Sequence, residues 1–238
     1  MQVQCDASQL EWRMALLLSR DEVGIEELKQ GQDVHGLNQV AFVLPERLIA
    51  KRFLFRTIFR GSGWAFANDN DFKHVSNDPD FWDEKNKLFY KKYKGLDQCH
   101  TQWAQLVASR TPIRGPTGRE WMIKLNDDGS IPWTVLSNYP VQGTSADLMS
   151  VARVSLKRRV NSSGLKCSVV STVHDSIVVD SPKENVDKVA GMMYSVFDDL
   201  PKNMKKLWGI DSPIAFPCEV KVGLSLGEME KYGRPTQH

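Results

Sequence analysis

Residues 171–180, with the sequence STVHDSIVVD, constrain the fold of this chain most. Runs of β-branched residues lie on both sides of a polar centre formed by His174, Asp175 and Ser176. Such runs favour strands, and a short polar break between two of them favours an antiparallel hairpin. The tip of this hairpin would present the Asp175 carboxylate at the end of a rigid sheet, where it needs a cation partner. An ordinary polar turn is the alternative interpretation.

Size and charge bound the kind of protein this chain can be. With 238 residues, 41% of them hydrophobic, it can bury one large core or two small ones. The 31 Lys and Arg residues nearly balance the 29 Asp and Glu residues, so the net charge of +2 does not by itself indicate a polyanionic partner. A nucleic-acid interface must therefore rest on local clusters of basic residues.

The cysteines and the apolar segments indicate a cellular compartment. The cysteines are scattered, without a CxxC pair: Cys5, Cys99, Cys167 and Cys218. This pattern argues against disulfides and structural zinc. The sequence has no signal-peptide pattern and no apolar run of about 18 residues. These features predict a cytoplasmic protein without a membrane partner.

Strands and helices alternate along the chain. Strands are predicted before Ser8, at 169–180 and at 216–227. Helices are predicted at 21–30, 45–60, 81–110 with an interruption near Gly95, and 184–199, with others after Ser8, Asp33 and Pro140. Residues 62–80 predict a loop, and residues 111–133, which Gly and Pro interrupt, predict small antiparallel strands. Because the strands form hairpins rather than regular βαβ units, the predicted fold class is α+β.

Residues 45–60 predict an unusual helix, which Pro45 opens and Gly61 ends. No acid follows Glu46 until Asp69, while five cations lie within the helix: Arg47, Lys51, Arg52, Arg56 and Arg60. Like charges four residues apart repel one another by about 0.2–0.5 kcal/mol a pair. We therefore expect an anion to compensate them.

One face of this helix has an order that suits a nucleotide. Arg47 and Lys51 share the face with Phe55 and Phe59. Two cations followed by two rings would match a triphosphate followed by a sugar and a base. A solvated basic face over an apolar core is the alternative interpretation.

Two acids extend this pattern. Asp6 ends the first predicted strand, and Asp175 lies in the predicted hairpin. If a sheet brought them together, both carboxylates would need a divalent ion, and two such ions can clamp the attacking and leaving oxygens of phosphoryl transfer. The order of these features along the chain, an acid, then a basic helix, then a second acid, thus predicts phosphoryl-transfer chemistry.

Several segments resemble, in order, the motifs of the family A DNA polymerases, the polymerase I family. DASQLEWR resembles the first motif of the family, ERLIAKRFLFRTIFRG its fingers helix, NYPVQGTSADLM the segment before the last motif, and VHDS the last motif. GQDVHG matches a family segment ahead of the fingers helix. The matches span Asp6 to Asp175, with weaker similarity to the C terminus.

The resemblance implies an antiparallel palm sheet that carries both acids, with an inserted helical fingers subdomain. It assigns residues 1–32 and 111–238 to the palm and residues 33–110, including the helix 45–60, to the fingers. The resemblance also implies that the thumb and 3′–5′ exonuclease domains of the family are absent from these residues. We therefore expect a second polypeptide to supply a thumb, with or without an exonuclease, as in a split phage-type polymerase. A piece cut from a longer polymerase is the alternative interpretation.

The resemblance also implies template-directed addition of dNTPs to a primer 3′ hydroxyl with two Mg²⁺ ions. Asp6 and Asp175 would hold the two metal ions. Lys51 would contact the triphosphate and protonate the leaving group, and Arg47 would bind the outer phosphates. These residues form the implied catalytic centre.

Other family positions imply contacts with the nucleotide and the DNA. Phe55 and Phe59 would pack on the sugar and base, and Glu11 would exclude a ribose 2′ hydroxyl. Gln9 belongs to the same nucleotide-binding set. The implied contacts with primer and template come from Asn138, Gln142, His174 and Arg13.

Four positions depart from the family pattern. Ser176 stands where DNA polymerases usually have Glu, and single-subunit RNA polymerases have His-Asp-Ser there. Phe59 replaces a tyrosine, Arg60 replaces the glycine after it, and Thr134 replaces a primer-contacting arginine. An RNA polymerase fragment therefore stays open as an alternative, although Glu11, where those enzymes usually have glycine, favours deoxynucleotides.

Two other classes of function stay open as well. A metal-dependent nuclease would also use paired Asp residues, but it would not need the helix with Arg, Lys and two Phe residues. A non-catalytic DNA-binding subunit would fit if a partner held the active centre. In each case the expected location is the cytoplasm of a bacterial or phage-infected cell.

Overall fold

The computed structural model describes residues 1–235 of the chain. The chain divides into two compact units, one formed by Met1–Leu10 and the chain from Thr144 onward, the other by Glu11–Gly143. The first unit contains an antiparallel sheet with helices, and the second is mainly helical. The predicted α+β class is confirmed, whereas the assignment of 1–32, 33–110 and 111–238 to palm and fingers stays a prediction.

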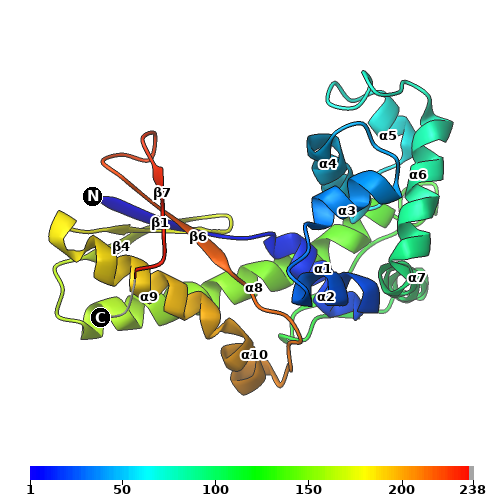
Figure 1. Ribbon diagram of the computed structural model, residues 1–238. Coiled ribbons are helices and arrows are strands. Elements are labelled where there is room, and N and C mark those ends of the chain that lie inside the picture. Colours follow the sequence, from blue (N-terminus) through cyan, green and yellow to red (C-terminus); the bar gives the residue numbers. More distant parts are fainter. Residues whose placement is uncertain (236–238) are drawn as a thin grey trace. The chain divides into compact units, whose positions relative to one another are not determined.

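The sheet of the first unit has five strands in the order β4-β5-β1-β6-β7 (Figure 1). The strands are β1 (Gln2–Ala7), β4 (Ser168–Val173), β5 (Ser176–Asp180), β6 (Cys218–Gly223) and β7 (Glu230–Tyr232). Every neighbouring pair is antiparallel. The first strand of the chain thus lies at the centre of the sheet, between strands from its C-terminal part.

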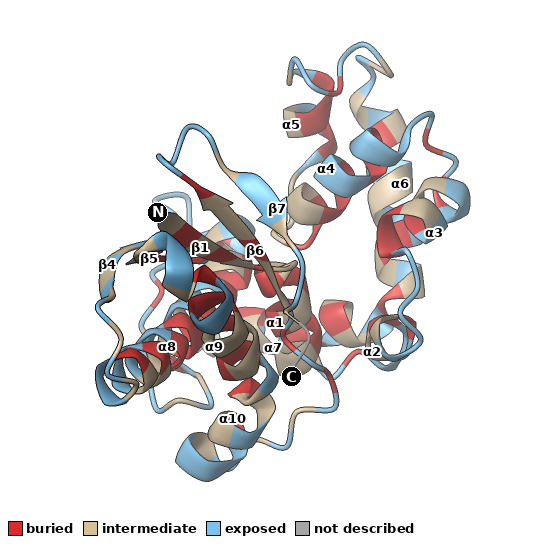
Figure 2. Ribbon diagram, turned by 60° about the vertical axis from the view of Figure 1, so that its left-hand side comes forward, coloured by how far each residue is buried: buried red, intermediate tan, exposed pale blue. Residues whose placement is uncertain are grey.

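One face of the sheet forms the core of this unit. Val3, Cys5 and Ala7 are buried, whereas the intervening residues of β1 are half-buried, as the two-residue period of a strand requires. Helix α9 (Val186–Asp198) packs against β1 and β6. Helix α8 (Trp133–Ser162) runs along the same side of the sheet, and Figure 2 shows the buried residues of these elements in red. The opposite face carries the polar residues of β1.

Strands β4 and β5 form the predicted hairpin. They are joined by His174 and Asp175 alone, and His174 has a positive φ of 52°. A two-residue connection with a positive φ at its first position is the geometry that matches the twist of paired strands. The backbone N–H of Ala7 donates to the Asp175 carbonyl at 2.9 Å and so joins this turn to the end of β1.

The second unit packs its helices around aromatic side chains. The helices are α1 (Leu10–Ser19), α2 (Glu22–Lys29), α3 (Val34–Ala41), α4 (Arg47–Thr57), α5 (Gly63–Ala67), α6 (Pro79–Lys92) and α7 (Lys94–Ala108). Phe53 of α4 lies at the centre of this core, with its ring 5.3 Å from Phe66, 6.1 Å from Trp82 and 6.2 Å from Phe89. Such ring pairs add stability to a core beyond what the burial of their apolar surface contributes.

A small sheet completes the second unit. It pairs β2 (Ile113–Arg114) with β3 (Glu120–Trp121), which confirms the predicted antiparallel strands. Ile113 and Ile123 pack against Leu136 near the start of α8. Across residues 1–235, every helix is either too short or too polar to cross a lipid bilayer.

Three sequence predictions of secondary structure differ from the structure, and two elements were not predicted. The helix predicted over 45–60 ends at Thr57, and the loop predicted over 62–80 contains α5. Helix α8 begins well before Pro140 and continues through it, because Leu136 and Val141 on either side of the proline are buried. Helix α10 (Leu200–Trp208) and strand β7 were not predicted, since both are short and their signals are weak.

The buried carboxylate of Asp21 ties two helices of the second unit together. Asp21 is 1% exposed and accepts hydrogen bonds from the backbone N–H groups of Gly24, Gly95 and Leu96 at 2.9, 2.8 and 3.3 Å. It thus caps the start of α2 and holds the first turn of α7. A Cβ atom on Gly95 would lie 2.7 Å from the Asp21 Cα, so only glycine fits there.

We expect Asp21→Ala to lower the free energy of unfolding by roughly 3 kcal/mol or more, because it leaves three backbone donors without their acceptor. Asp78→Ala is the matched control, since the exposed Asp78 caps α6 with one hydrogen bond to the Asp80 N–H. This control should cost about 1 kcal/mol. Urea unfolding monitored by circular dichroism measures the free energy of unfolding of both variants. Equal losses of stability would contradict the role of Asp21 in joining α2 to α7.

Candidate active site

Asp6 and Asp175 lie at the same end of neighbouring strands. Asp6 is near the C-terminal end of β1 and faces Ser176, the first residue of β5, while Asp175 directly precedes that residue. The Asp6 side chain is 26% exposed, and Asp175 is exposed together with His174. The fold thus brings two acids that are far apart in sequence to the same end of the paired strands β1 and β5.

Both oxygens of the Asp6 carboxylate have partners in the sheet. Gln4 donates from Nε2 to Asp6 Oδ1 at 2.8 Å. Lys221 of β6 places its Nζ 3.2 Å from Asp6 Oδ2. Asp6 is therefore held in one orientation at the open face of the sheet.

The two acids suit Mg²⁺. No group of three or more His, Cys, Asp or Glu side chains in residues 1–235 is arranged to hold a metal ion. Mg²⁺ does not require such a cage, because it keeps several waters and binds through one or two carboxylates together with substrate phosphates. Asp6 is 26% exposed and Asp175 is exposed, and they lie on adjacent segments at the same end of the strands. One carboxylate from each segment would match that mode of binding.

Ser176 does not take the place of an acid at this end of the strands. Its side chain is buried, and Oγ donates to the Val173 carbonyl at 2.9 Å. The hydroxyl therefore forms a hydrogen bond across the turn of the hairpin. Its contacts are structural and do not distinguish a DNA polymerase from an RNA polymerase.

The cations of α4 and the turn after it are compensated mainly by acids of the same unit, which sequence analysis did not anticipate. Four of the five have an acid partner: Arg47 with Asp33, Arg52 with Asp71, Arg56 with Asp69 and Arg60 with Asp97. Lys51 is exposed and is the one cation of the five without an ion-pair partner in the described part of the chain. An external anion therefore meets an uncompensated charge at Lys51.

Arg47 is held in place by Asp33. The guanidinium Nε and Nη2 donate to the two carboxylate oxygens at 2.7 Å each, and this pair lowers the pKa of Asp33 to about 2. A bidentate pair fixes the plane of the guanidinium. A phosphate that binds Arg47 must share or replace this partner.

His35 belongs to the same group, and sequence analysis gave it no role. It is buried on α3 with its ring 6.2 Å from that of Phe55. Burial, followed by the charge of Arg47 and then that of Lys51, lowers the pKa of His35. The sequence signal for His35 is the GQDVHG segment, in which it is the histidine.

The two phenylalanines of the predicted nucleotide face differ in position. Phe55 lies on α4 and, with Lys51 and Arg52, lines a hollow of about 450 Å³. Phe59 lies beyond the end of α4, in the turn formed by residues 58–60, and is half-buried. The predicted continuous helical face therefore ends before Phe59.

The remaining predicted residues lie on α1, on α8 and in the turn between β1 and α1. Gln142 of α8 donates from Nε2 to Glu11 Oε1 of α1 at 3.2 Å. Gln9 adopts a positive φ of 54° between β1 and α1. Asn138 on α8 is half-buried, and burial lowers the pKa of Arg13 on α1.

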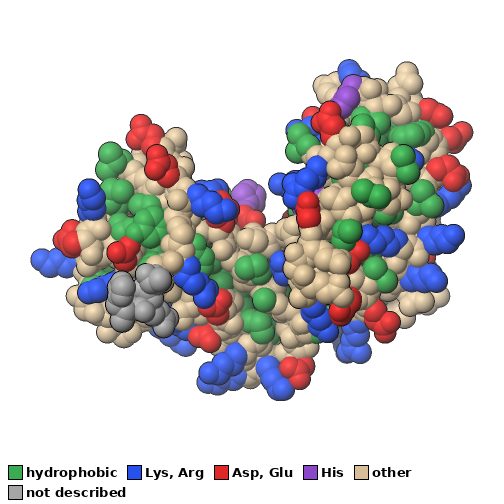
Figure 3. Space-filling model, viewed as in Figure 1, with side chains coloured by type: hydrophobic (Ala, Val, Ile, Leu, Met, Phe, Trp, Pro, Cys, Tyr) green, Lys and Arg blue, Asp and Glu red, His purple; other side chains and the backbone are tan. Residues whose placement is uncertain are grey.

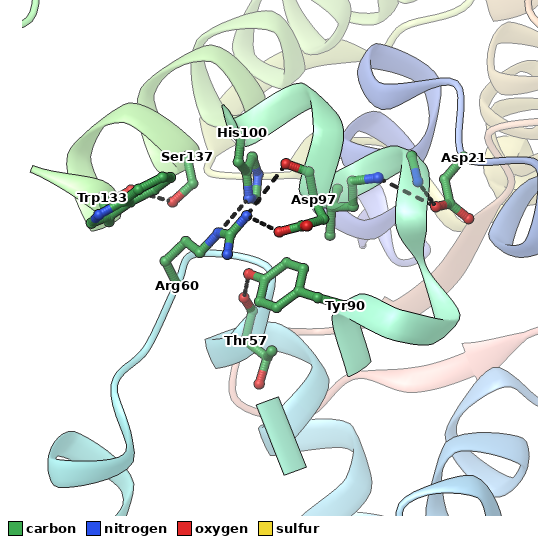
Figure 4. A network of polar contacts seen from close by, with 10 residues as sticks. Asp21, Thr57, Arg60, Tyr90, Asp97, His100, Trp133 and Ser137 are labelled. Carbon is green, nitrogen blue, oxygen red and sulfur yellow. Dashed lines mark hydrogen bonds and ion pairs between the residues drawn. The ribbon is translucent and has the colours of Figure 1, made fainter. Parts of the chain in front are cut away.

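Arg60 lies in the turn after α4 and takes part in a network that Figure 4 shows. Its φ is 58°, a conformation that L residues rarely adopt. The guanidinium lies 3.8 Å from the centre of the Tyr90 ring, donates to Asp97 Oδ1 at 2.6 Å and donates to His100 Nδ1 at 3.1 Å. These contacts compensate the backbone strain at the position where the family pattern has glycine.

Charges of both signs are interleaved on the surface. Figure 3 shows Lys and Arg side chains (blue) dispersed among Asp and Glu side chains (red) on the visible face. This agrees with the net charge of +2. On the face drawn in Figure 3, the local positions of cations, rather than a broad basic surface, would therefore determine any contact with phosphates.

Comparison with known proteins identifies the family. The model of DNA polymerase family A matches residues 1–228. This chain belongs to DNA polymerase family A. Curated relatives include DNA polymerase I of Aquifex aeolicus, 26% identical over 77% of the chain, and the DNA polymerase of Bacillus phage SP01, 24% identical over 95% of it. The thermostable DNA polymerase I of Thermus aquaticus is 26% identical over 93% of the chain.

A solved structure of a family A member supports the fold. The chain matches the POL domain of Pol1 from M. smegmatis, in a complex with DNA primer-template and dNTP, with a TM-score of 0.75 and 18% identity. The match covers 94% of this chain and 39% of that one. The chain also spans only 33% of the Aquifex relative and 26% of the phage and Thermus relatives.

His100 should make the stability of this family A chain depend on pH. Burial, with the nearby charge of Arg60, lowers the pKa of His100 from 6.5 to about 3. Between these values the unfolded chain binds a proton that the folded chain does not, so stability falls as pH decreases from about 6.5. His100→Gln should flatten the dependence by up to about 1.4 kcal/mol per pH unit.

The control for this prediction is His74→Gln, because His74 is exposed. Urea unfolding at pH 7, 6 and 5 gives the free energies. An unchanged slope in His100→Gln, or an equal change in both variants, would contradict the assignment.

Proposed function

We propose that this chain is the catalytic part of a template-directed DNA polymerase, which adds dNTPs to a primer 3′ hydroxyl. The observation that carries the proposal is the position of Asp6 and Asp175 at one end of adjacent central strands. Membership of DNA polymerase family A supports it. The family A domain from M. smegmatis was solved with primer-template DNA and dNTP, and we extend these two ligands to this chain.

In this proposal, Asp6 and Asp175 hold two Mg²⁺ ions. Bound Mg²⁺ would bring the primer hydroxyl to the α-phosphate and neutralise the charge of the leaving pyrophosphate. The protein would contribute the positions of the two carboxylates, and Gln4 and Lys221 support that of Asp6. Water and the phosphates of the substrate would complete the ligands.

Lys51 and Arg47 bind the triphosphate in this proposal. We assign Lys51 contact with the triphosphate and protonation of the leaving group. The uncompensated charge of its ammonium group supports this role. Arg47 would exchange Asp33 for the outer phosphates, since guanidinium groups bind carboxylate and phosphate with similar geometry. Phe55 and Phe59 would pack on the sugar and base.

Glu11 would exclude ribonucleotides by occupying the space that a 2′ hydroxyl needs. Its hydrogen bond with Gln142 supports this role, because the bond restricts the position of the carboxylate. Gln9 would contribute to the nucleotide site. Contacts with the primer and template would come from Asn138, Gln142, His174 and Arg13.

A second polypeptide would complete the enzyme by supplying a thumb and, in some arrangements, a 3′–5′ exonuclease. The chain spans 26% of the length of the phage SP01 relative. A thumb grips the duplex, so the chain alone should bind DNA weakly and extend it with low processivity. We place the reaction in the cytoplasm of a bacterial or phage-infected cell.

Primer extension tests the proposal. With Mg²⁺ and dNTPs, Asp6→Asn and Asp175→Asn should each lower extension at least about a hundredfold, because each removes a metal-binding charge. Asp180→Asn is the matched control, since the exposed Asp180 ends β5 and hydrogen-bonds Gln2. It should extend like the unaltered chain.

Other outcomes separate the alternatives. Extension with rNTPs in place of dNTPs would favour the RNA polymerase fragment. Cleavage of labelled DNA without nucleotides would favour a nuclease, and full activity of Asp175→Asn beside a partner would favour a non-catalytic subunit. A folded chain that extends nothing alone requires the assay to be repeated with the thumb-bearing polypeptide, and failure there would contradict the proposal.

Lys51 and Arg52 offer a matched pair for the nucleotide site. Lys51→Ala should slow single-nucleotide insertion by about a hundredfold, because it removes the uncompensated cation. Arg52→Ala removes a neighbouring cation that is already paired with Asp71 at 2.8 Å, and it should change insertion by no more than about twofold. Single-turnover insertion kinetics measure both, and similar losses would argue against a special role for Lys51.

A further inference from the structure

A ladder of polar side chains crosses the open face of the sheet beside Asp6. In the strand register, Gln4 lies opposite Lys221, Asp6 opposite Glu219, and Lys221 opposite Lys231 of β7. Because side chains alternate along a strand and directly paired residues share a face, these five point to the same side. Residues at the alternate positions, such as Cys5, are buried on the other side. Asp6 therefore lies at the end of a continuous charged row.

Within this ladder the ammonium group of Lys221 is directed to Asp6. Its Nζ is 3.2 Å from Asp6 Oδ2 but 3.8 Å from Glu219 Oε1. Glu219 has a closer partner in Lys231, whose Nζ lies 2.6 Å from Oε2. The shorter ion pair of Lys221 is thus the one with Asp6.

The surroundings strengthen this pair. The side chains of Lys221 and Asp6 are 37% and 26% exposed, so water screens the pair less than a fully exposed one. Gln4 holds the other carboxylate oxygen at 2.8 Å. The ammonium group therefore offsets one of two acidic charges that would otherwise repel each other at the sheet edge.

We propose that Lys221 is the built-in counter-charge of Asp6 and that a divalent cation must displace its ammonium group to bind this carboxylate. This inference rests on the proposed function, in which Asp6 and Asp175 hold metal ions. A cation and an ammonium group on one carboxylate repel each other, so Lys221 lowers the metal affinity of the site. Glu219, within 3.8 Å of Lys221 Nζ, offers the displaced group a second partner.

Binding of Mn²⁺, as a probe for Mg²⁺, tests this inference without nucleotide turnover. Free Mn²⁺ is measured by electron paramagnetic resonance during titration of the whole chain at constant ionic strength. Lys221→Gln should bind Mn²⁺ about five- to tenfold more tightly, since a part-buried ion pair of about 1 kcal/mol or more no longer competes. Lys221→Arg keeps the charge and should bind like the unaltered chain.

Lys205→Gln is the matched control, because the exposed Lys205 pairs with Asp211 at 2.9 Å and takes no part in the ladder. It should change Mn²⁺ affinity by no more than about twofold. An unchanged or weaker affinity in Lys221→Gln, or an equal gain in Lys205→Gln, would overturn the inference. A circular dichroism spectrum of each variant verifies that it is folded.

Two further variants separate failure of this inference from failure of the proposed function. If Asp6→Asn and Asp175→Asn lose Mn²⁺ binding but Lys221→Gln binds like the unaltered chain, the metal site stands and the role of Lys221 is wrong. If both Asn variants bind Mn²⁺ as well as the unaltered chain, the proposed metal site fails, and the inference about Lys221 fails with it.

Discussion

The antiparallel pairing of β1 with both β5 and β6 is the interaction on which the first unit depends. It places the start of the chain between strands that form much later in the sequence. These contacts are non-local, so their loop-closure entropy must be overcome before they stabilise the fold. The burial of alternate β1 residues against α9 offsets this cost, and the same alternation directs Asp6 to the open face.

In the second unit, the stability of α4 depends on the pairing of its cations with acids from other segments. A helix with cations at most of its exposed positions is stable here because Asp33, Asp69 and Asp71 lie beside it. Each pair is modest in energy, but together they relieve the repulsion along α4. The pairing is also selective, since it leaves Lys51 exposed and uncompensated in the described part of the chain. Paired cations and one exposed, unpaired cation thus coexist on one helix in this part of the structure.

Local signals were sufficient for part of this description. The hairpin followed from β-branched runs around a polar pair, and the start of α4 followed from Pro45. What could not be predicted depends on distant partners, such as Asp33 for Arg47, Asp97 for Arg60 and Lys221 for Asp6. Similarly, Pro140 lies inside α8 because tertiary packing outweighs the local tendency of proline to end a helix. The neighbourhood of Asp6 and Asp175 was expected from the family resemblance, not from any local pattern.

The turn between β4 and β5 has a consequence for how the sequence can vary. With two residues in the connection, each added or lost residue would shift the register of β5 against β1 or enlarge the turn. A shift of one position would move buried Ile177 and Val179 to the open face. Substitutions at the hairpin can therefore be tested one side chain at a time, whereas insertions and deletions there would alter the core and the acidic edge together.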